Sequence, residues 1–330
     1  MSFYPLPTGL RDALPEEARA EEALVRELLA TFARAGFERV ITPMFEFAEV
    51  LELGLGRRAL ANMLTFVEPE SGEIAALRPD ITPQIARLVA TRLSRRARPL
   101  RISYEGTVAR RRAGRARRQR QIRQVGAELV GQPGRDGDLA MIETLGAALH
   151  AVGLAKSTLD LTDAGIVHAL IGDVGSEQAS EIGAALAVKD EAAVRSAARG
   201  TGREATLAAL THLSGGPAAL DEARATLAGG PASPYVDRLT ALHDAVLRLG
   251  IFDVVLVDIG EVRELDYYTG CMFHVFADGP GAPIAGGGRY DTLLARFGVD
   301  APAVGFALDL ENLAWARRRA GLENLLAGDP

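Results

Sequence analysis

An alanine-rich, mostly helical stretch over residues 141–249 divides the chain into two blocks that have the pattern of strands. Strand-like segments precede it at residues 38–42, 100–104 and 121–129, and others follow it at 252–258, 270–276 and after Ala285. Polar residues at alternate positions of 100–104 and 121–129 indicate two strands joined by a long turn. We therefore predict one sheet-based core that carries a mostly helical insertion over about residues 165–249.

Three segments outside this stretch have helical signatures. The first begins at Pro15, continues through Glu16 and Glu17, which complement a helix dipole, and ends at Gly36. Glycine favours that end because it readily adopts the left-handed backbone of helix C-termini. Helices are also predicted over residues 81–93 and 310–319.

Composition excludes several classes of protein. Of the 330 residues, 48% are hydrophobic and 24% are charged, so the chain can bury a core. The formal net charge of −6 argues against a nucleic-acid binder held by overall charge. A single cysteine, Cys271, excludes an internal disulfide framework, and the histidines show no metal-binding spacing. We predict no metal, no cofactor, no membrane span and no signal peptide, and therefore a cytoplasmic location.

Six short blocks of sequence carry the resemblance to a known family. They are residues 36–45 (GFERVITPMF), 78–82 (RPDIT), 124–128 (QVGAE), 263–270 (RELDYYTG), 286–291 (GGGRYD) and 305–313 (GFALDLENL). The first resembles motif 1 of class II aminoacyl-tRNA synthetases, which builds their dimer interface. The others occur in the order found in histidyl-tRNA synthetases. The resemblance covers nearly the whole chain and implies an α+β fold with a mostly antiparallel sheet flanked by helices, and a homodimer formed through the motif 1 region.

The polar residues of these blocks suit a pocket for a small zwitterion. Asp80 and Thr82 can accept hydrogen bonds from an ammonium group. Gln124 and Glu128 lie on one face of an extended strand because strand side chains repeat every second residue. A buried, hydrogen-bonded acceptor of this kind discriminates strongly, since an analogue without the donor leaves it unpaired.

By resemblance, the matching positions of the synthetases bind histidine. Glu128 would accept from an imidazole N–H, Tyr268 would bond the other ring nitrogen, and Arg263 would lie near the carboxylate. The predicted histidine-binding set is Asp80, Thr82, Gln124, Glu128, Arg263, Tyr267 and Tyr268.

The ATP-binding half departs from the synthetase pattern. Motif 2 of active synthetases has an arginine two residues before its glutamate, and that position holds Ser103 here. Motif 3 has a second arginine where Asn312 stands, and a small residue where Asp309 stands. Cations that neutralise transition-state charge are worth about 10²–10³ in rate each. We therefore predict a degenerate ATP site and no aminoacylation.

Few residues follow motif 3, whereas active synthetases continue into an anticodon-binding domain. In this respect the chain resembles the regulatory subunits of ATP phosphoribosyltransferase, a paralogous family in histidine biosynthesis, and the 78–87 segment also looks closer to them. That resemblance implies a non-catalytic chain that assembles with a short catalytic subunit, is required for the first step of the pathway and carries feedback by L-histidine. No tRNA partner is predicted.

Two alternative functions, and the role of one loop, remain open from the sequence. The chain could be a truncated histidine–tRNA ligase, or a free-standing histidine-binding module that serves another protein. The loop over residues 110–120 has seven arginines and no acid. It could bind an anion or a partner, or it could be a solvated segment that reflects an arginine-rich composition, because a charge run by itself specifies no partner.

Overall fold

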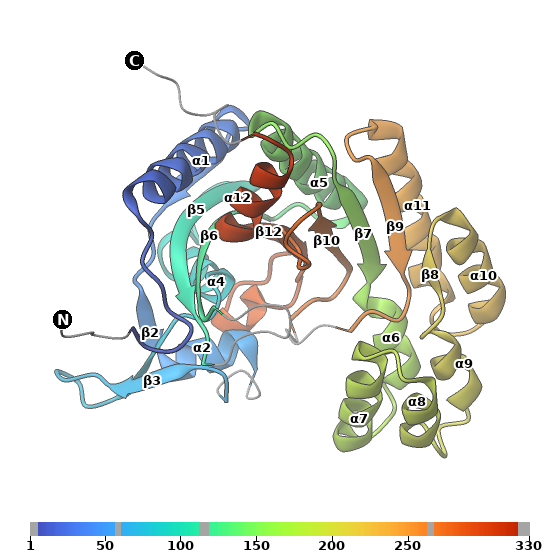
Figure 1. The fold of residues 1–330 in the computed structure, drawn as a ribbon. Coiled ribbons are helices and arrows are strands. Elements are labelled where there is room, and N and C mark those ends of the chain that lie inside the picture. The colour runs from blue at the N-terminus through green and yellow to red at the C-terminus, as the bar shows by residue number, and fades with distance from the viewer. Residues whose placement is uncertain (1–5, 57–60, 112–118, 263–266, 323–330) are drawn as a thin grey trace.

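The centre of the protein is a nine-stranded sheet (Figure 1). The computed structural model describes residues 6–56, 61–111, 119–262 and 267–322. In sheet order the strands are β1 (Glu38–Val40), β5 (Leu100–Ala109), β6 (Gln121–Val130), β12 (Ala303–Asp309), β11 (Ala285–Arg289), β10 (Cys271–Phe276), β7 (Thr158–Asp163), β9 (Val254–Asp258) and β8 (Ser214–Gly215). Neighbours are antiparallel except β1–β5 and β7–β9. The predicted α+β fold with a mostly antiparallel sheet is confirmed.

One face of this sheet is apolar and covered by helices. Strand residues such as Val125, Phe273 and Phe306 are buried there against α1 (Pro15–Arg34), α5 (Gly134–Ala151), α11 (Ser233–Leu249) and α12 (Leu310–Arg319). Helix α1 contributes Leu24, Leu28 and Phe32, which recur at helical spacing and face inward. Its end matches the prediction, because Gly36 has φ +82°. This apolar face holds the larger of two hydrophobic clusters.

A second, three-stranded sheet was not predicted. Strands β2 (Phe45–Phe47), β4 (Ile74–Leu77) and β3 (Leu64–Val67) pair in that order, next to α2 (Ala48–Leu55) and α4 (Thr82–Arg92). The strands are three or four residues long, too short to show a clear alternation of polar and apolar residues. In Figure 1 the labelled strands β2 and β3 lie at the lower left, at the side opposite the α7–α10 helices.

The stretch predicted as an insertion contains helices joined by short turns. They are α6 (Ala164–Ile171), α7 (Ser176–Ala187), α8 (Glu191–Ala197), α9 (Glu204–Ala209), α10 (Pro217–Leu227) and α11. Its apolar residues, including Ile182, Leu186 and Val246, belong to the same hydrophobic cluster as the apolar face of the sheet. The stretch therefore shares its core with the sheet, and its status as a separate insertion stays a prediction.

Most predicted elements agree with the structure apart from their ends. The helix predicted over 310–319 coincides with α12, and the one over 81–93 corresponds to α4. Strand β5 continues to Ala109, five residues beyond the prediction, because Glu105–Ala109 pair with Gln121–Val125 of β6. In the described part of the chain, no helix has the length and apolarity needed to cross a bilayer.

Candidate functional site

The face of the large sheet opposite α1, α5, α11 and α12, which we call the open face, is partly covered by α2 and α4 and has a floor of glycines. A Cβ atom at Gly305 would lie 1.4 Å from Oε2 of Glu128, and one at Gly126 would lie 2.4 Å from the Tyr104 ring. A Cβ atom at Gly288 would likewise lie 2.8 Å from the ring of Tyr268. Glycine inside a strand weakens it but permits close approach. These strands therefore give up side-chain packing so that large polar side chains can lie flat against the sheet.

Glu128 is the centre of a hydrogen-bond network on this face. Its side chain is buried, with the residue 1% exposed. Oε1 accepts from the hydroxyls of Thr82 at 2.9 Å and Tyr104 at 3.1 Å, and Oε2 accepts from the hydroxyl of Tyr290. A carboxylate has about four lone-pair sites. Three internal donors therefore leave Glu128 room for about one more.

Asp80 is a second buried carboxylate, at the start of α4. The Tyr267 hydroxyl donates to its Oδ2 at 2.9 Å, and the backbone N–H groups of Ile81 and Thr82 also favour its charged form. The Tyr267 ring packs against the rings of Tyr268, at 4.6 Å between centroids, and Tyr290, at 5.6 Å. The aromatic rings thus connect the surroundings of Asp80 with those of Glu128.

Burial makes both acids reluctant to ionise. It raises the pKa of Glu128 from 4.5 to about 8, although the hydroxyl donors oppose the shift, and it also raises the pKa of Asp80. Among the described residues, neither carboxylate forms an ion pair. The positive charge of Arg110 lowers the pKa of Asp80, against the larger effect of burial. A cationic group placed between these acids would relieve their desolvation penalty.

Gln124 completes this face of β6. It pairs with Asp309 of β12, while Glu128 pairs with Gly305, so the two β6 side chains point to the same side as predicted. Oε1 of Gln124 is buried and has no hydrogen-bond partner in the described part of the protein. A buried, unpaired acceptor is costly, so it marks a position where a donor from a ligand would be stabilising. Predicted Arg263 lies outside the described residues.

The predicted ATP-site residues do not form one group. Ser103 lies opposite Ala127, whose side chain packs in the helix-covered apolar cluster, whereas its neighbours Ile102 and Tyr104 belong to the other face. Because strand side chains alternate, Ser103 points away from Glu128. Its assignment to a degenerate ATP site with Asp309 and Asn312 stays a prediction. The arginine whose charge reaches Asp80 is Arg110, seven residues further along.

Asp309 and Asn312 lie at the far end of β12. The Asp309 carboxylate accepts the N–H of Asn312 at 3.1 Å and so caps α12. Asn312 Nδ2 donates to the carbonyl of Pro283 at 2.8 Å. Since Asp309 pairs with Gln124, its side chain adds a third acid to the open face of the sheet.

Two site residues were missed by the sequence analysis, Tyr104 and Tyr290. Each donates a hydroxyl to Glu128 from a different strand or strand end. Tyr290 stands within the GGGRYD block, and Tyr104 is followed two residues later by Gly106, whose missing Cβ leaves room for Arg78. Glycines inside strands next to large polar residues are the sequence feature that could have pointed to these two tyrosines.

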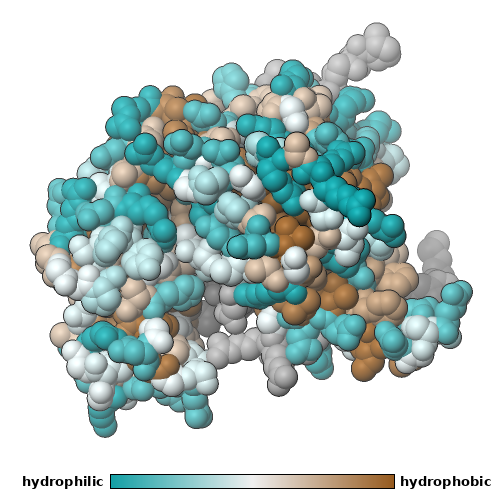
Figure 2. Space-filling view, turned by 180° about the vertical axis from the view of Figure 1, so that it is seen from behind, coloured by the Kyte–Doolittle hydropathy of each residue, from teal (hydrophilic) through white to brown (hydrophobic). Residues whose placement is uncertain are grey.

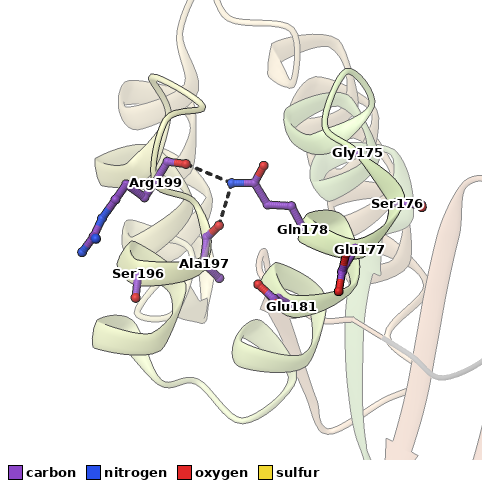
Figure 3. Close-up of a pocket in the computed structure, with 8 residues that line it drawn as sticks. All are labelled: Gly175, Ser176, Glu177, Gln178, Glu181, Ser196, Ala197 and Arg199. Atoms are coloured by element: carbon purple, nitrogen blue, oxygen red, sulfur yellow. Dashed lines mark hydrogen bonds between the residues drawn. The ribbon is translucent and has the colours of Figure 1, made fainter.

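An open depression also lies between α7 and α8, far along the chain from these residues (Figure 3). Its main polar contact is internal, because Gln178 Nε2 donates to the carbonyls of Ala197 at 2.8 Å and Arg199 at 3.0 Å. The acids Glu177 and Glu181 lie at its edge (Figure 3). Within the described ranges, no cluster of three or more His, Cys, Asp or Glu side chains could hold a metal ion. The open face of the sheet is therefore the candidate site.

Comparison with known proteins identifies the family. The sequence model of the histidyl-tRNA synthetase family matches residues 9–313. The chain is also 43% identical over 322 residues to the ATP phosphoribosyltransferase regulatory subunit of Anaeromyxobacter dehalogenans strain 2CP-C, covering 96% of this chain and 92% of that protein. The chain belongs to the histidyl-tRNA synthetase-like family of ATP phosphoribosyltransferase regulatory subunits.

Solved structures agree with membership of this family. A Bacillus halodurans protein described as an ATP phosphoribosyltransferase regulatory subunit/histidyl-tRNA synthetase superposes with a TM-score of 0.81 at 30% identity, covering 95% of this chain and 83% of that one. A histidine–tRNA ligase subunit of Alicyclobacillus acidocaldarius gives 0.83 at 30% identity, covering 97% and 99%. The class II synthetase-like fold expected for the family is confirmed.

Proposed function

We propose that this chain is a non-catalytic regulatory subunit that binds L-histidine on the open face of its sheet and regulates a separate ATP phosphoribosyltransferase catalytic subunit of the short form. One observation carries the proposal. Asp80 and Glu128 are buried on one face with uncharged donors around them, and the acceptor of Gln124 is unpaired beside them. Such a site favours a small ligand that brings its own ammonium and ring N–H donors.

The proposed roles follow this distribution of acceptors. Asp80 accepts from the α-ammonium group of histidine, with Gln124 and Thr82 nearby. Glu128 uses its remaining acceptor site for an imidazole N–H, and Tyr268 bonds the other ring nitrogen. Arg263 pairs with the carboxylate. Tyr267 holds Asp80 in place through its 2.9 Å hydrogen bond.

Loss of aminoacylation is supported by Asp309 and Asn312. ATP is a polyanion, and Asp309 is an acid on this face at a position where active synthetases have a small residue. Asn312 is engaged with a backbone carbonyl and supplies no positive charge. Phosphoryl and adenylyl transfer need cations at the phosphates. We therefore infer that the chain neither adenylates histidine nor charges tRNA.

We further propose that the chain forms a homodimer through the motif 1 region, within a larger assembly with the catalytic subunit in the cytoplasm. Large apolar side chains are exposed there, including Ile41 at 79%, Met44 at 64% and Phe45 at 41%. The neighbouring small sheet exposes Phe66, Val67 and Ile74. Figure 2 shows brown side chains at the lower right, where the half-turn brings β2 and β3. A patch of this kind marks an interaction surface, and the fold family favours a second copy as its occupant.

Titration calorimetry tests the ligand. We expect L-histidine to bind to the purified chain and ATP not to bind. Glu128→Ala should abolish the histidine signal while circular dichroism stays native, and unchanged affinity would refute the pocket. Histidine-dependent pyrophosphate exchange would favour a truncated ligase instead.

Reconstitution tests the partner. Mixed with a short phosphoribosyltransferase catalytic subunit from the same organism, the chain should co-elute in gel filtration and raise its rate. Histidine should lower that rate, because a ligand shifts an assembly only when it binds the active and inhibited forms unequally. Histidine binding without any effect on that enzyme would favour a free-standing binding module.

A further inference from the structure

Arg78 is a buried arginine that uses its guanidinium without a carboxylate partner in the described chain. The residue is 6% exposed, and burial lowers the pKa of its guanidinium. Nε donates to the carbonyl of Thr107 at 2.8 Å. Nη1 lies 2.8 Å from Oγ1 of Thr42 and 3.1 Å from the carbonyls of Thr42 and Pro43. A guanidinium presents its donors in a rigid fork, so these groups are held in one geometry.

The acceptors at one end of Arg78 belong to the exposed apolar segment. Thr42 and Pro43 stand between Ile41 and Met44, which are 79% and 64% exposed. The backbone N–H of Arg78 donates to the carbonyl of Met44 at 3.3 Å. Gln84 strengthens the junction, because its Nε2 donates to the carbonyl of Pro43 at 2.9 Å and its Oε1 accepts from Arg78. The position of residues 41–44 therefore depends on direct hydrogen bonds with Arg78.

The other end of Arg78 leads to the pocket. Asp80 follows two residues later, across Pro79, whose ring fixes its backbone torsion. Arg78 directly follows the last residue of β4, Leu77, which pairs with Phe45 in the small sheet. The guanidinium of Arg78 also packs closely against the open face of β5, since a Cβ atom at Gly106 would lie 2.0 Å from its Nη2. A shift of the 41–45 segment would therefore move Arg78, and through the short, rigid connection across Pro79 it would also move Asp80.

We propose that Arg78 is a positioning residue that links dimer formation to histidine binding, by making the place of Asp80 depend on how the 41–45 segment is seated against a second copy. This inference rests on the proposed function of the pocket and of the apolar surface. Linkage is reciprocal, so if each site of the dimer binds histidine more tightly than the monomer by a given factor, filling both sites strengthens the dimer by the square of that factor. Couplings of this kind span about 5- to 150-fold.

The first measurement uses the whole chain. Histidine dissociation constants are determined by calorimetry at protein concentrations below and above the dimer dissociation constant found by sedimentation equilibrium. If dilution does not yield monomer, Ile41→Glu supplies it. We expect the monomer to bind histidine at least about fivefold more weakly, within the usual range of couplings. Saturating histidine should strengthen the dimer by the square of the measured factor, because each dimer has two sites.

Two variants test whether Arg78 carries the link. Arg78→Lys keeps the charge but loses the fork, and Thr42→Val removes one acceptor, at 2.8 Å, with little change in volume. Each should leave binding of histidine to the dimer measurable, while the ratio of the monomer's dissociation constant to that of the dimer falls toward one. Arg96→Gln is the matched control, since Arg96 bonds Glu38 of β1 at 2.6 Å on the exposed surface and should leave the ratio unchanged.

The outcomes separate the inference from the proposed function. Absence of histidine binding by the wild-type dimer would overturn both. Binding with equal affinity by monomer and dimer, or an unchanged ratio in Thr42→Val, would overturn only the role of Arg78 and leave the histidine pocket intact. If Arg78→Lys does not fold, Thr42→Val alone tests whether Arg78 links dimer formation to histidine binding. A ratio lost equally in Arg96→Gln would show that any disturbance of β1 uncouples the sites, and would also refute a specific role for Arg78.

Discussion

The two faces of the large sheet are built from the same strands and serve opposite purposes. On the helix-covered face, apolar residues such as Val125, Phe273 and Phe306 are buried against the covering helices. On the open face, Glu128 and Asp80 are buried with hydroxyl donors and a glycine floor. Alternation along each strand puts a stabilising residue and a functional residue side by side.

The difference shows where the protein gains stability and where it gives some up. Burial of apolar area contributes about 25 cal/mol per Å², so the helix-covered face stabilises the fold. A buried carboxyl group on the open face costs free energy, and its raised pKa reports that cost. The cost is tolerated where a ligand can offset it. Mutations on the two faces should therefore separate stability from ligand binding.

The largest effect is expected on the apolar face. Phe273 is 0% exposed in the central strand β10. Phe273→Ala should lower the free energy of unfolding by about 3–5 kcal/mol, because it removes buried area and leaves a cavity. Chemical denaturation monitored by circular dichroism measures the change. A loss below about 1 kcal/mol would mean that this face contributes less to the core than its burial indicates.

Gly305→Ala should damage the open face. The added methyl group would meet Oε2 of Glu128 at 1.4 Å and force that side chain away from its donors. We expect histidine affinity to fall by at least about a hundredfold, since a displaced buried acceptor loses ligand bonds worth about 1–3 kcal/mol each. Calorimetry is the measurement, and Ala307→Gly, on the same strand and face, is the control. Unchanged affinity in Gly305→Ala would place the ligand elsewhere.

Glu128→Gln should change how stability depends on pH. The pKa of Glu128 is about 8 in the folded protein and 4.5 in its ordinary state. Between these values the folded protein holds a proton that the unfolded chain has lost, so ligand-free stability falls as pH rises through this window. Glutamine does not titrate and should flatten the decline, leaving the part that comes from other buried acids with raised pKa values, such as Asp80 and Asp138.

Thermal melts at pH 5 to 9 test this expectation. Glu105→Gln is the matched control, because Glu105 lies on the helix-covered side of β5 and pairs with Arg123 at 2.8 Å. It should keep the wild-type decline of melting temperature with pH. If the wild-type melting temperature rises between pH 6 and 8, Glu128 is not held in its neutral form and the cost assigned to the open face is absent.

Much of the fold followed from local patterns. The helix that ends at Gly36 and the one over 310–319 have clear apolar periodicity and end signals, and both were predicted closely. The small sheet was not predicted because its short strands show no alternation of buried apolar and exposed polar residues. Apolar side chains such as Phe45 and Ile74 are themselves exposed. A surface that binds another chain lacks the alternation that identifies a strand.

The site was harder to predict because it depends on register. Asp80 and Glu128 lie in recognisable blocks, but the donors Tyr104 and Tyr290 reach Glu128 from separate parts of the chain. The face that Ser103 occupies was also hard to predict, because a shift of one residue along a strand moves a side chain to the other face. Only the pairing of Ser103 with Ala127 shows which face it occupies.

The smallest effect should come from Tyr290→Phe, which removes one hydroxyl from the open face and keeps the ring packed against Tyr267. Glu128 would retain the donors Thr82 and Tyr104. We expect the free energy of unfolding to change by only about 1 kcal/mol, the net worth of one hydrogen bond. Histidine affinity should change by less than about tenfold, because an acceptor site on Glu128 is freed as a donor is lost. Denaturation and calorimetry measure the two effects. A loss of affinity as large as that of Gly305→Ala would show that Tyr290 contacts the ligand itself, and the open face would then bind histidine through its donors as well as its acids.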